Sequence, residues 1–192
     1  MSTPEQVLAF WLDEIGPKGW YETSDTLDAQ IAERFMPVWQ QSMEGALSMW
    51  MTYPSGALAY LIVTDQFPRN MFRGQARAFA SDHLGLAVSK AAILKDWDLR
   101  IDPPARQFFY LPLMHSESVT DQERCVRLFH TRMADSDGNN LLHAKAHREV
   151  IRKFGRFPFR NDALERRTTE PEADFIKEGG YGATVRALQA TG

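Results

Sequence analysis

Apolar residues recur every three or four positions along most of the chain, which is the spacing of one face of an α-helix. The clearest run places Leu27, Ile31, Phe35, Val38 and Trp39 on such a face. The same pattern, bounded by proline, glycine and capping residues, predicts helices over residues 4–15, 24–39, 54–67, 76–94, 103–113, 120–133, 141–154 and 169–177. The β-branched run 61–64 is the one strand-like stretch, and its helical flanks argue against a sheet.

These elements predict an all-α fold. The helices come in sequential pairs with short connections, so we expect antiparallel helical hairpins packed as a bundle or a short superhelix. A length of 192 residues suits a single domain, 1–192. The segment after about residue 179 is expected to be irregular.

Several signals predict where individual helices begin and end. Gly155 is expected to end one helix, Gly16 to stop another, and Pro37 to kink or divide the helix that contains it. Capping boxes, in which a threonine and a glutamine or glutamate three residues later satisfy amide groups at a helix start, are predicted at 3–6, 120–123 and 169–172, and a turn at 135–140.

One short phrase occurs twice. Residues 65–70 read Asp-Gln-Phe-Pro-Arg-Asn, and residues 155–161 read Gly-Arg-Phe-Pro-Phe-Arg-Asn. Because proline disfavours helical geometry in the residue before it, Phe67 and Phe157 are predicted to be the last residues that can close a helix. Two loops of the same chemistry can meet in space and form one basic, hydrogen-bonding site. Its predicted ligand-binding residues are Asp65, Arg69, Asn70, Arg73, Arg156, Arg160 and Asn161.

A purely structural role accounts for both copies as well. Arginine beyond a helix C-terminus can hydrogen-bond the last carbonyl groups, and asparagine can cap the next turn. On this second hypothesis the two phrases serve only to end helices.

A second group of candidate residues lies at 113–117. A histidine and a carboxylate two residues apart, His115 and Glu117, can supply acid–base chemistry near neutral pH, with Asp65 as a further member. They are the candidate catalytic pair. The alternative is that both side chains merely cap neighbouring helices.

Two further features suggest chemistry less strongly. His143 and His147 lie four residues apart on one helix face, a zinc-like spacing, but the zincin glutamate is missing at Ala144, so we expect no metal. Cys125 is the one cysteine, and it is expected to lie on a helix and face the protein core rather than to react. We expect no cofactor, because the sequence has no glycine-rich phosphate loop, nucleophile elbow or cofactor fingerprint.

Composition excludes several classes of protein. The longest apolar stretch is far below the roughly 20 residues of a membrane span, and no secretory signal is recognisable, so we expect a cytoplasmic protein with no membrane partner. A net charge of −3 and the absence of a binding motif argue against nucleic acid. Basic residues nevertheless dominate 145–167, as on a solvated helix face or beside an anionic ligand.

Three segments carry a resemblance to a known family: 61–79, 110–117 and 154–161. With these residues the chain resembles the uncharacterised bacterial proteins called domain of unknown function 924. The resemblance implies a tetratricopeptide-like helical fold and supplies no activity. The chain departs from the family pattern at Phe159, where histidine is usual, and at Glu165-Arg166, where glycine usually precedes the arginine.

The leading functional hypothesis is a protein that binds a small anionic metabolite or the acidic end of a peptide in a pocket lined by arginine, asparagine and histidine. A second is a helical scaffold for protein–protein interaction, as a partner or a homo-oligomer, with no small-molecule site. A third is an enzyme with His115 as its acid–base group. Phe159, which replaces an acid–base group, favours binding over catalysis.

Overall fold

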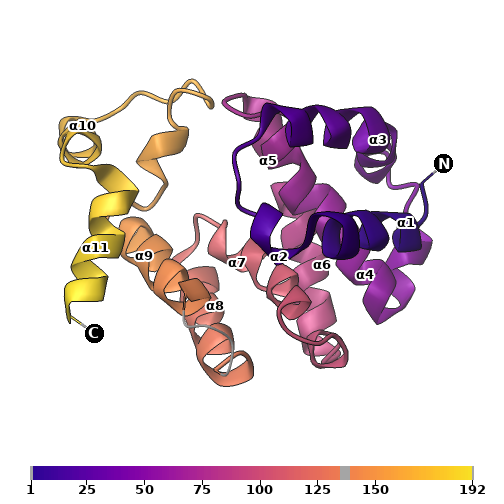
Figure 1. Ribbon diagram of the computed structural model, residues 1–192. Helices are drawn as coiled ribbons and strands as arrows, with labels where there is room; N and C mark the ends of the chain where they lie inside the picture. Colours follow the sequence, from indigo (N-terminus) through magenta and orange to yellow (C-terminus); the bar gives the residue numbers. More distant parts are fainter. Residues whose placement is uncertain (1, 135–138, 192) are drawn as a thin grey trace. The chain divides into compact units, whose positions relative to one another are not determined.

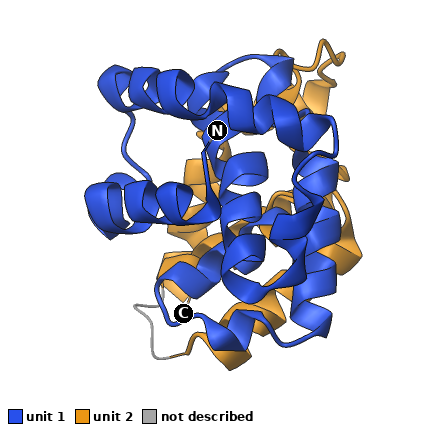
Figure 2. Cartoon of the chain, turned by 90° about the vertical axis from the view of Figure 1, so that its right-hand side faces the viewer, with its two compact units in different colours: residues 1–112 blue, residues 113–192 orange. Residues whose placement is uncertain are grey.

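The computed structural model describes residues 2–134 and 139–191, and every regular element in these ranges is a helix (Figure 1). The predicted all-α class is therefore confirmed. The predicted turn at 135–140 lies largely outside the described residues. The chain divides into two compact units, Met1–Pro112 and Leu113–Gly192 (Figure 2). The single-domain organisation and the tetratricopeptide-like packing stay predictions.

The helices are short, and several are joined by π-helical or 3₁₀ turns. The first unit contains α1 (Pro4–Leu8), α2 (Gly16–Gly19), α3 (Asp25–Met43), α4 (Pro54–Leu61), α5 (Phe67–Met71) and α6 (Asp82–Leu94). Helix α7 (Leu111–Met114) spans the division, and the second unit contains α8 (Val119–Arg132), α9 (Asn139–Phe154), α10 (Glu170–Lys177) and α11 (Gly180–Thr191). The π-helical segments are Ala9–Ile15 and Ile62–Gln66, and the 3₁₀ segments are Ser48–Thr52, Ala76–Phe79, Asp98–Arg100, Ala105–Phe109 and Pro158–Arg160. Among the described residues, each helix is too short or too polar to cross a lipid bilayer.

Two of the three predicted capping boxes are present. Thr3 caps α1 together with Gln6, and Thr169 caps α10 together with Glu172. The third prediction is wrong, because α8 begins at Val119 after the extended residue Ser118, which places Thr120 inside the first turn.

The first Phe-Pro phrase does not end a helix, contrary to the prediction. The chain passes from α4 through the π-helical segment Ile62–Gln66 into α5, with Pro68 in its first turn. Proline has no amide hydrogen to donate to the carbonyl four residues earlier, that of Thr64. The Ser81 hydroxyl donates to that carbonyl instead, at 2.6 Å, and accepts from Nε1 of Trp39 at 3.0 Å. The helical path continues because a side chain from beyond α5 replaces the missing amide.

Other boundaries also differ from the prediction. Helix α3 runs unbroken past Pro37, so the proline does not divide it. The segments predicted as helices over 76–94 and 103–113 each open with a 3₁₀ turn, and a shorter α-helix comes after it. The chain after residue 179, predicted to be irregular, forms α11.

Each unit has an aromatic core of its own. In the first unit the rings of Phe10, Phe35 and Phe67 lie 4.7–6.2 Å apart, and Trp11 meets Phe67 edge-on at 5.5 Å. In the second unit the core cluster consists of the buried residues Val150, Ile151, Phe157 and Phe175, with Phe154 and Tyr181 packed against it. Phe67 and Phe157, the aromatic residues of the doubled phrase, are thus core residues of their units.

Gly155 ends α9 as predicted, in the left-handed conformation with a φ of +69°. Its amide donates to the carbonyl of Ile151 at 2.8 Å. A Cβ atom here would meet nothing within 4 Å, so only the backbone conformation opposes a side chain.

Replacing Gly155 by alanine is therefore expected to lower the free energy of unfolding by about 1 kcal/mol, the cost of a left-handed backbone for an L-residue. Gly155→Asn should cost less, because asparagine tolerates this conformation better. Urea denaturation monitored by circular dichroism measures both. Equal losses for the two variants would show that something other than backbone conformation opposes the side chain.

Candidate functional site

In the first unit, the residues of the first phrase pair with aspartates. Arg69 lies 3.0 Å from Oδ1 of Asp82 and 3.3 Å from a carboxylate oxygen of the buried Asp65. Asn70 donates to Asp28 at 2.8 Å, and Arg73 donates to both oxygens of the same carboxylate at 2.9 Å. Asp28 belongs to α3 and Asp82 to α6, so these bonds tie α5 to both helices.

The positive charges of this cluster are matched by acidic side chains within it. Two guanidinium groups face three carboxylates, so the cluster has no excess of positive charge for an anion. The pairing favours the structural hypothesis for Asp65, Arg69, Asn70 and Arg73, and their part in a ligand site stays a prediction.

In the second unit, Glu117 is held by the second phrase. Its carboxylate accepts the amide of Phe157 at 2.8 Å and a two-pronged interaction from Arg166 at 2.8 and 3.1 Å. Although burial raises the pKa of Glu117, the donors Arg166 and Phe157 outweigh it and leave that pKa below its usual range. Glu117 is therefore ionised and holds the loop through its hydrogen bonds. An ionised carboxylate has no proton to donate, which argues against a role for Glu117 as a general acid.

Arg156 and Asn161 meet a second carboxylate, that of the buried Glu172. Arg156 donates to both oxygens of Glu172, at 2.6 and 2.8 Å, and Asn161 donates to it at 3.4 Å. Asn161 also accepts from Arg166 at 3.1 Å, which joins the Glu172 and Glu117 pairs into one network. This network fastens the loop between α9 and α10.

Arg160 lies deeper than the other arginines of the loop. Its side chain is buried, with the residue 6% exposed, and its guanidinium group stands 4.5 Å from the centre of the Phe157 ring. One of its terminal nitrogens donates to the backbone carbonyl of His115 at 3.0 Å. The structure thus brings two predicted site residues, His115 and Arg160, together. Arg69, which was predicted to join them, belongs to the other unit.

The loop that carries His115 is itself fixed. The amide group of Gln122 donates to the carbonyls of Met114 and Ser116 at 2.6 and 2.8 Å, and the Ser116 hydroxyl donates to Asp121 at 2.8 Å. The start of α8 therefore holds the backbone on both sides of His115.

Two histidines of α9 extend this cluster. The His147 ring lies 6.3 Å from that of His115, 5.4 Å from Phe157 and 4.6 Å from Tyr181. Its Nδ1 lies 2.8 Å from the carbonyl of His143, and a carbonyl can only accept, so Nδ1 carries the hydrogen and Nε2 is left as an acceptor. Nδ1 of His143 in turn contacts the Tyr181 hydroxyl at 2.5 Å.

The electrostatic setting of His147 is unusual. Burial lowers its pKa to about 3, and the positive charges of His115 and Arg160 act in the same direction. His147 is therefore neutral at physiological pH. Phe159 completes the surroundings, stacked on Phe157 at 5.2 Å and 50% exposed.

Neither metal nor thiol chemistry has support in this region. Among the residues that the structure describes, no three histidine, cysteine, aspartate or glutamate side chains are grouped so as to hold a metal ion. Cys125 faces the core, as predicted, and burial raises the pKa of its thiol.

Several members of the cluster were not identified as site residues from the sequence. Glu172 was visible only as a capping residue, and Arg166 only as part of the basic stretch 145–167 and as a departure from a family pattern. His147 was considered only as a metal ligand. Tyr181 comes directly after a glycine pair and gave no signal, because its contact with His143 depends on α11, which was not predicted.

Fold and cluster together define an all-α protein whose C-terminal unit holds a network of arginine, glutamate and histidine side chains around a small aromatic core. The chain belongs to a family of bacterial proteins of unknown function, DUF924, whose model matches residues 7–180. This confirms the resemblance seen in the three sequence segments.

The chain is also similar to a solved structure, that of the protein of unknown function ATU0120 from Agrobacterium tumefaciens. The two share 33% sequence identity with a TM-score of 0.85, over 91% of this chain and 97% of that one. No curated protein matches the chain.

Proposed function

We propose that the second unit binds a small anion, such as the carboxylate or phosphate group of a metabolite or the acidic end of a peptide, beside His115, His147 and Arg160. The observation that carries this proposal is the buried guanidinium group of Arg160, which donates to the carbonyl of His115 and lies beside the ring of Phe157. Burial is the main cause of the low pKa of His147, and Arg160 acts in the same direction.

The wider network gathers three guanidinium groups. Arg156 pairs with Glu172, Arg166 pairs with Glu117, and Arg160 donates to the carbonyl of His115. Arginine offers paired donors that match a carboxylate or phosphate.

Within this proposal the predicted residues divide into two roles. Arg160 and His115 would face the ligand, with Nε2 of His147 as an acceptor for a ligand hydroxyl or protonated oxygen. Arg156, Asn161 and Glu117 would position the loop. Acid–base catalysis by His115 stays a hypothesis.

The test measures the protonation of His147 with and without inorganic phosphate. At about pH 5 an ordinary histidine, with a pKa near 6.5, is protonated, whereas His147 should show the nitrogen chemical shifts of a neutral ring. The negative charge of bound phosphate should favour the imidazolium form and raise the protonated fraction of His147. His130, exposed on α8, is the internal control.

A variant of Arg160 tests whether phosphate binds at this site. Arg160→Gln should weaken phosphate binding at least about tenfold, the effect of losing one charged hydrogen-bonding group, while Lys145→Gln, which removes an exposed charge from α9, should leave binding unchanged. Circular dichroism verifies that both variants fold. If phosphate leaves the His147 signals of the wild-type protein unchanged at saturating concentration, the proposal is wrong.

A further inference from the structure

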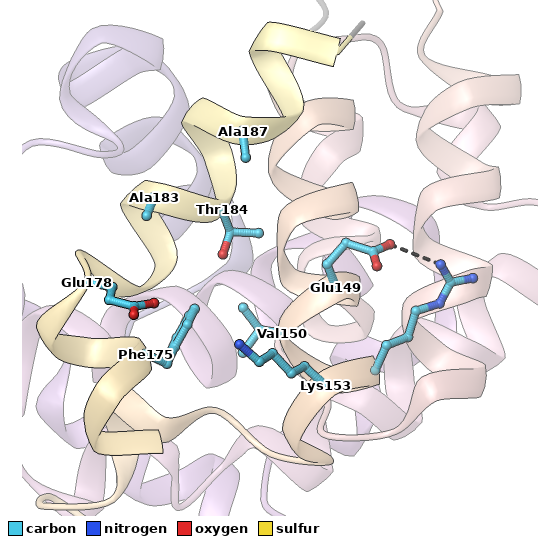
Figure 3. Close-up of a pocket in the computed structure, with 9 residues that line it drawn as sticks. Glu149, Val150, Lys153, Phe175, Glu178, Ala183, Thr184 and Ala187 are labelled. Atoms are coloured by element: carbon cyan, nitrogen blue, oxygen red, sulfur yellow. Dashed lines mark hydrogen bonds and ion pairs between the residues drawn. The ribbon is translucent and has the colours of Figure 1, made fainter. Parts of the chain in front are cut away.

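A separate cavity of about 520 Å³ lies in the second unit, between α9, the end of α10 and α11 (Figure 3). Its volume falls in the range of small-molecule sites. The residues that line it are Glu149, Val150, Arg152, Lys153, Phe175, Glu178, Ala183, Thr184 and Ala187. None of them belongs to the cluster around His147.

The cavity has an apolar wall. Val150 and Phe175 are buried members of the core cluster. Ala183 and Ala187 lie one helical turn apart on α11, and their small side chains leave the space open. This wall would receive an apolar group of about the size of a leucine side chain.

Charged residues border the wall, and they fall into two kinds. Arg152 and Glu149 are bonded to each other at 3.0 Å, so their charges offset. Lys153 is different: its ammonium group lies over the rings of Phe154 and Phe175, at 5.0 and 5.6 Å from their centres.

Lys153 and Glu178 differ from Arg152 and Glu149, which form an ion pair with each other. No ion pair joins either side chain to another described residue. Figure 3 shows Lys153 extending from α9 toward Phe175, with Glu178 near the other side of that ring. The cavity thus presents one positive and one negative group on either side of an apolar surface.

We propose that this cavity binds a small zwitterion with an apolar body, namely an apolar amino acid or short peptide with free ends. Its carboxylate would pair with Lys153, its ammonium group with Glu178, and its side chain would pack on Val150 and Phe175. A purely anionic ligand would leave Glu178 unmatched, and a purely apolar ligand would leave both charges unmatched.

The experiment compares three probes by calorimetry: the dipeptide Leu-Leu, its N-acetyl derivative and its C-terminal amide. Wild-type protein should bind Leu-Leu, and removal of either ligand charge should weaken binding at least fivefold. Lys153→Met should abolish the discrimination against the amide, and Glu178→Gln should abolish the discrimination against the acetylated form. Lys177→Met, on α10 but outside the cavity, is the matched control and should behave as wild type.

A third variant tests the cavity itself. Ala183→Leu should fill part of the space and weaken Leu-Leu binding, while circular dichroism and thermal unfolding report whether α11 is intact. Equal binding of all three probes to the wild-type protein, no binding of any of them, or undiminished binding to a folded Ala183→Leu protein would each overturn the proposal. Because Arg160 is not involved, Arg160→Gln should leave Leu-Leu binding unchanged.

Discussion

Replacing Ser81 by alanine is expected to lower the free energy of unfolding of the first unit by about 3 kcal/mol. The Ser81 side chain is fully buried and makes two hydrogen bonds, to the Thr64 carbonyl and from the Trp39 indole. Alanine would leave both partners buried and unsatisfied, at about 1–3 kcal/mol each. All five tryptophans, at positions 11, 20, 39, 50 and 97, lie in this unit, so urea denaturation monitored by tryptophan fluorescence reports the loss.

Pro68 provides the sharper control. Pro68→Ala restores an amide hydrogen that can donate to the Thr64 carbonyl, so the cost of Ser81→Ala should be smaller in the Pro68→Ala background. Ser48→Ala, at an exposed serine of the same unit, should have little effect. Strictly additive losses at Ser81 and Pro68 would mean that the hydroxyl does not stand in for the missing amide.

Glu172→Gln is expected to destabilise the second unit by about 2 kcal/mol. Glu172 is 1% exposed and accepts from Arg156, from the amide and hydroxyl of Thr169 and from Asn161. The glutamine keeps the shape of the side chain, but it loses the charge and one acceptor, which weakens the pair and the capping box together. Circular dichroism during urea denaturation measures the loss, and Glu170→Gln, at an exposed position in the same turn, is the matched control.

The same variant has a distinct dependence on pH. The Arg156 side chain and the Thr169 amide hold the pKa of Glu172 far below its usual range. A carboxylate with a depressed pKa stabilises the fold above its unfolded pKa, about 4.3, and this stability is lost as the pH falls further. Wild-type protein should therefore lose its advantage over Glu172→Gln only below about pH 4.

His147 contributes to the acid sensitivity over a higher range. Its folded pKa of about 3 lies below the ordinary value near 6.5, so the unfolded chain binds an additional proton between these values. Stability should therefore already decline as the pH falls below about 6.5, in both wild type and Glu172→Gln. A difference between the two proteins that is constant from pH 7 to about pH 2 would contradict the role of Glu172.

The all-α class and many helix boundaries were predictable, because they depend on nearby residues. The capping box at Thr169 and the glycine stop at Gly155 act over three or four positions, and both are present as predicted. The prediction that Phe67 ends a helix was wrong, because the path of that helix depends on a residue distant in the sequence. Its helix continues because of Ser81, whose position relative to Thr64 is set by tertiary packing that no local pattern reveals.

The sequence predicted several residues of the candidate site, but it did not predict which of them pair with one another. The sequence identified Arg156, Arg160 and His115, but it gave no indication that Glu172 neutralises Arg156. It also could not place Tyr181 against His143, since that contact joins α11 to α9 across 38 positions. Which arginines are neutralised by acids is decided by the three-dimensional fold, so an excess of arginine in the sequence overstated the free positive charge.

The π-helical segment Ile62–Gln66 has a consequence for how insertions and deletions would affect this chain. Each residue of an α-helix rotates the rest of the helix by about 100° around its axis. Deleting one residue from this segment would turn α5 by that angle and direct Asn70 and Arg73 away from Asp28 on α3. The length of this five-residue segment is therefore geometrically constrained, and a change of length here would misalign α5 while leaving the other helix-forming signals in the sequence intact.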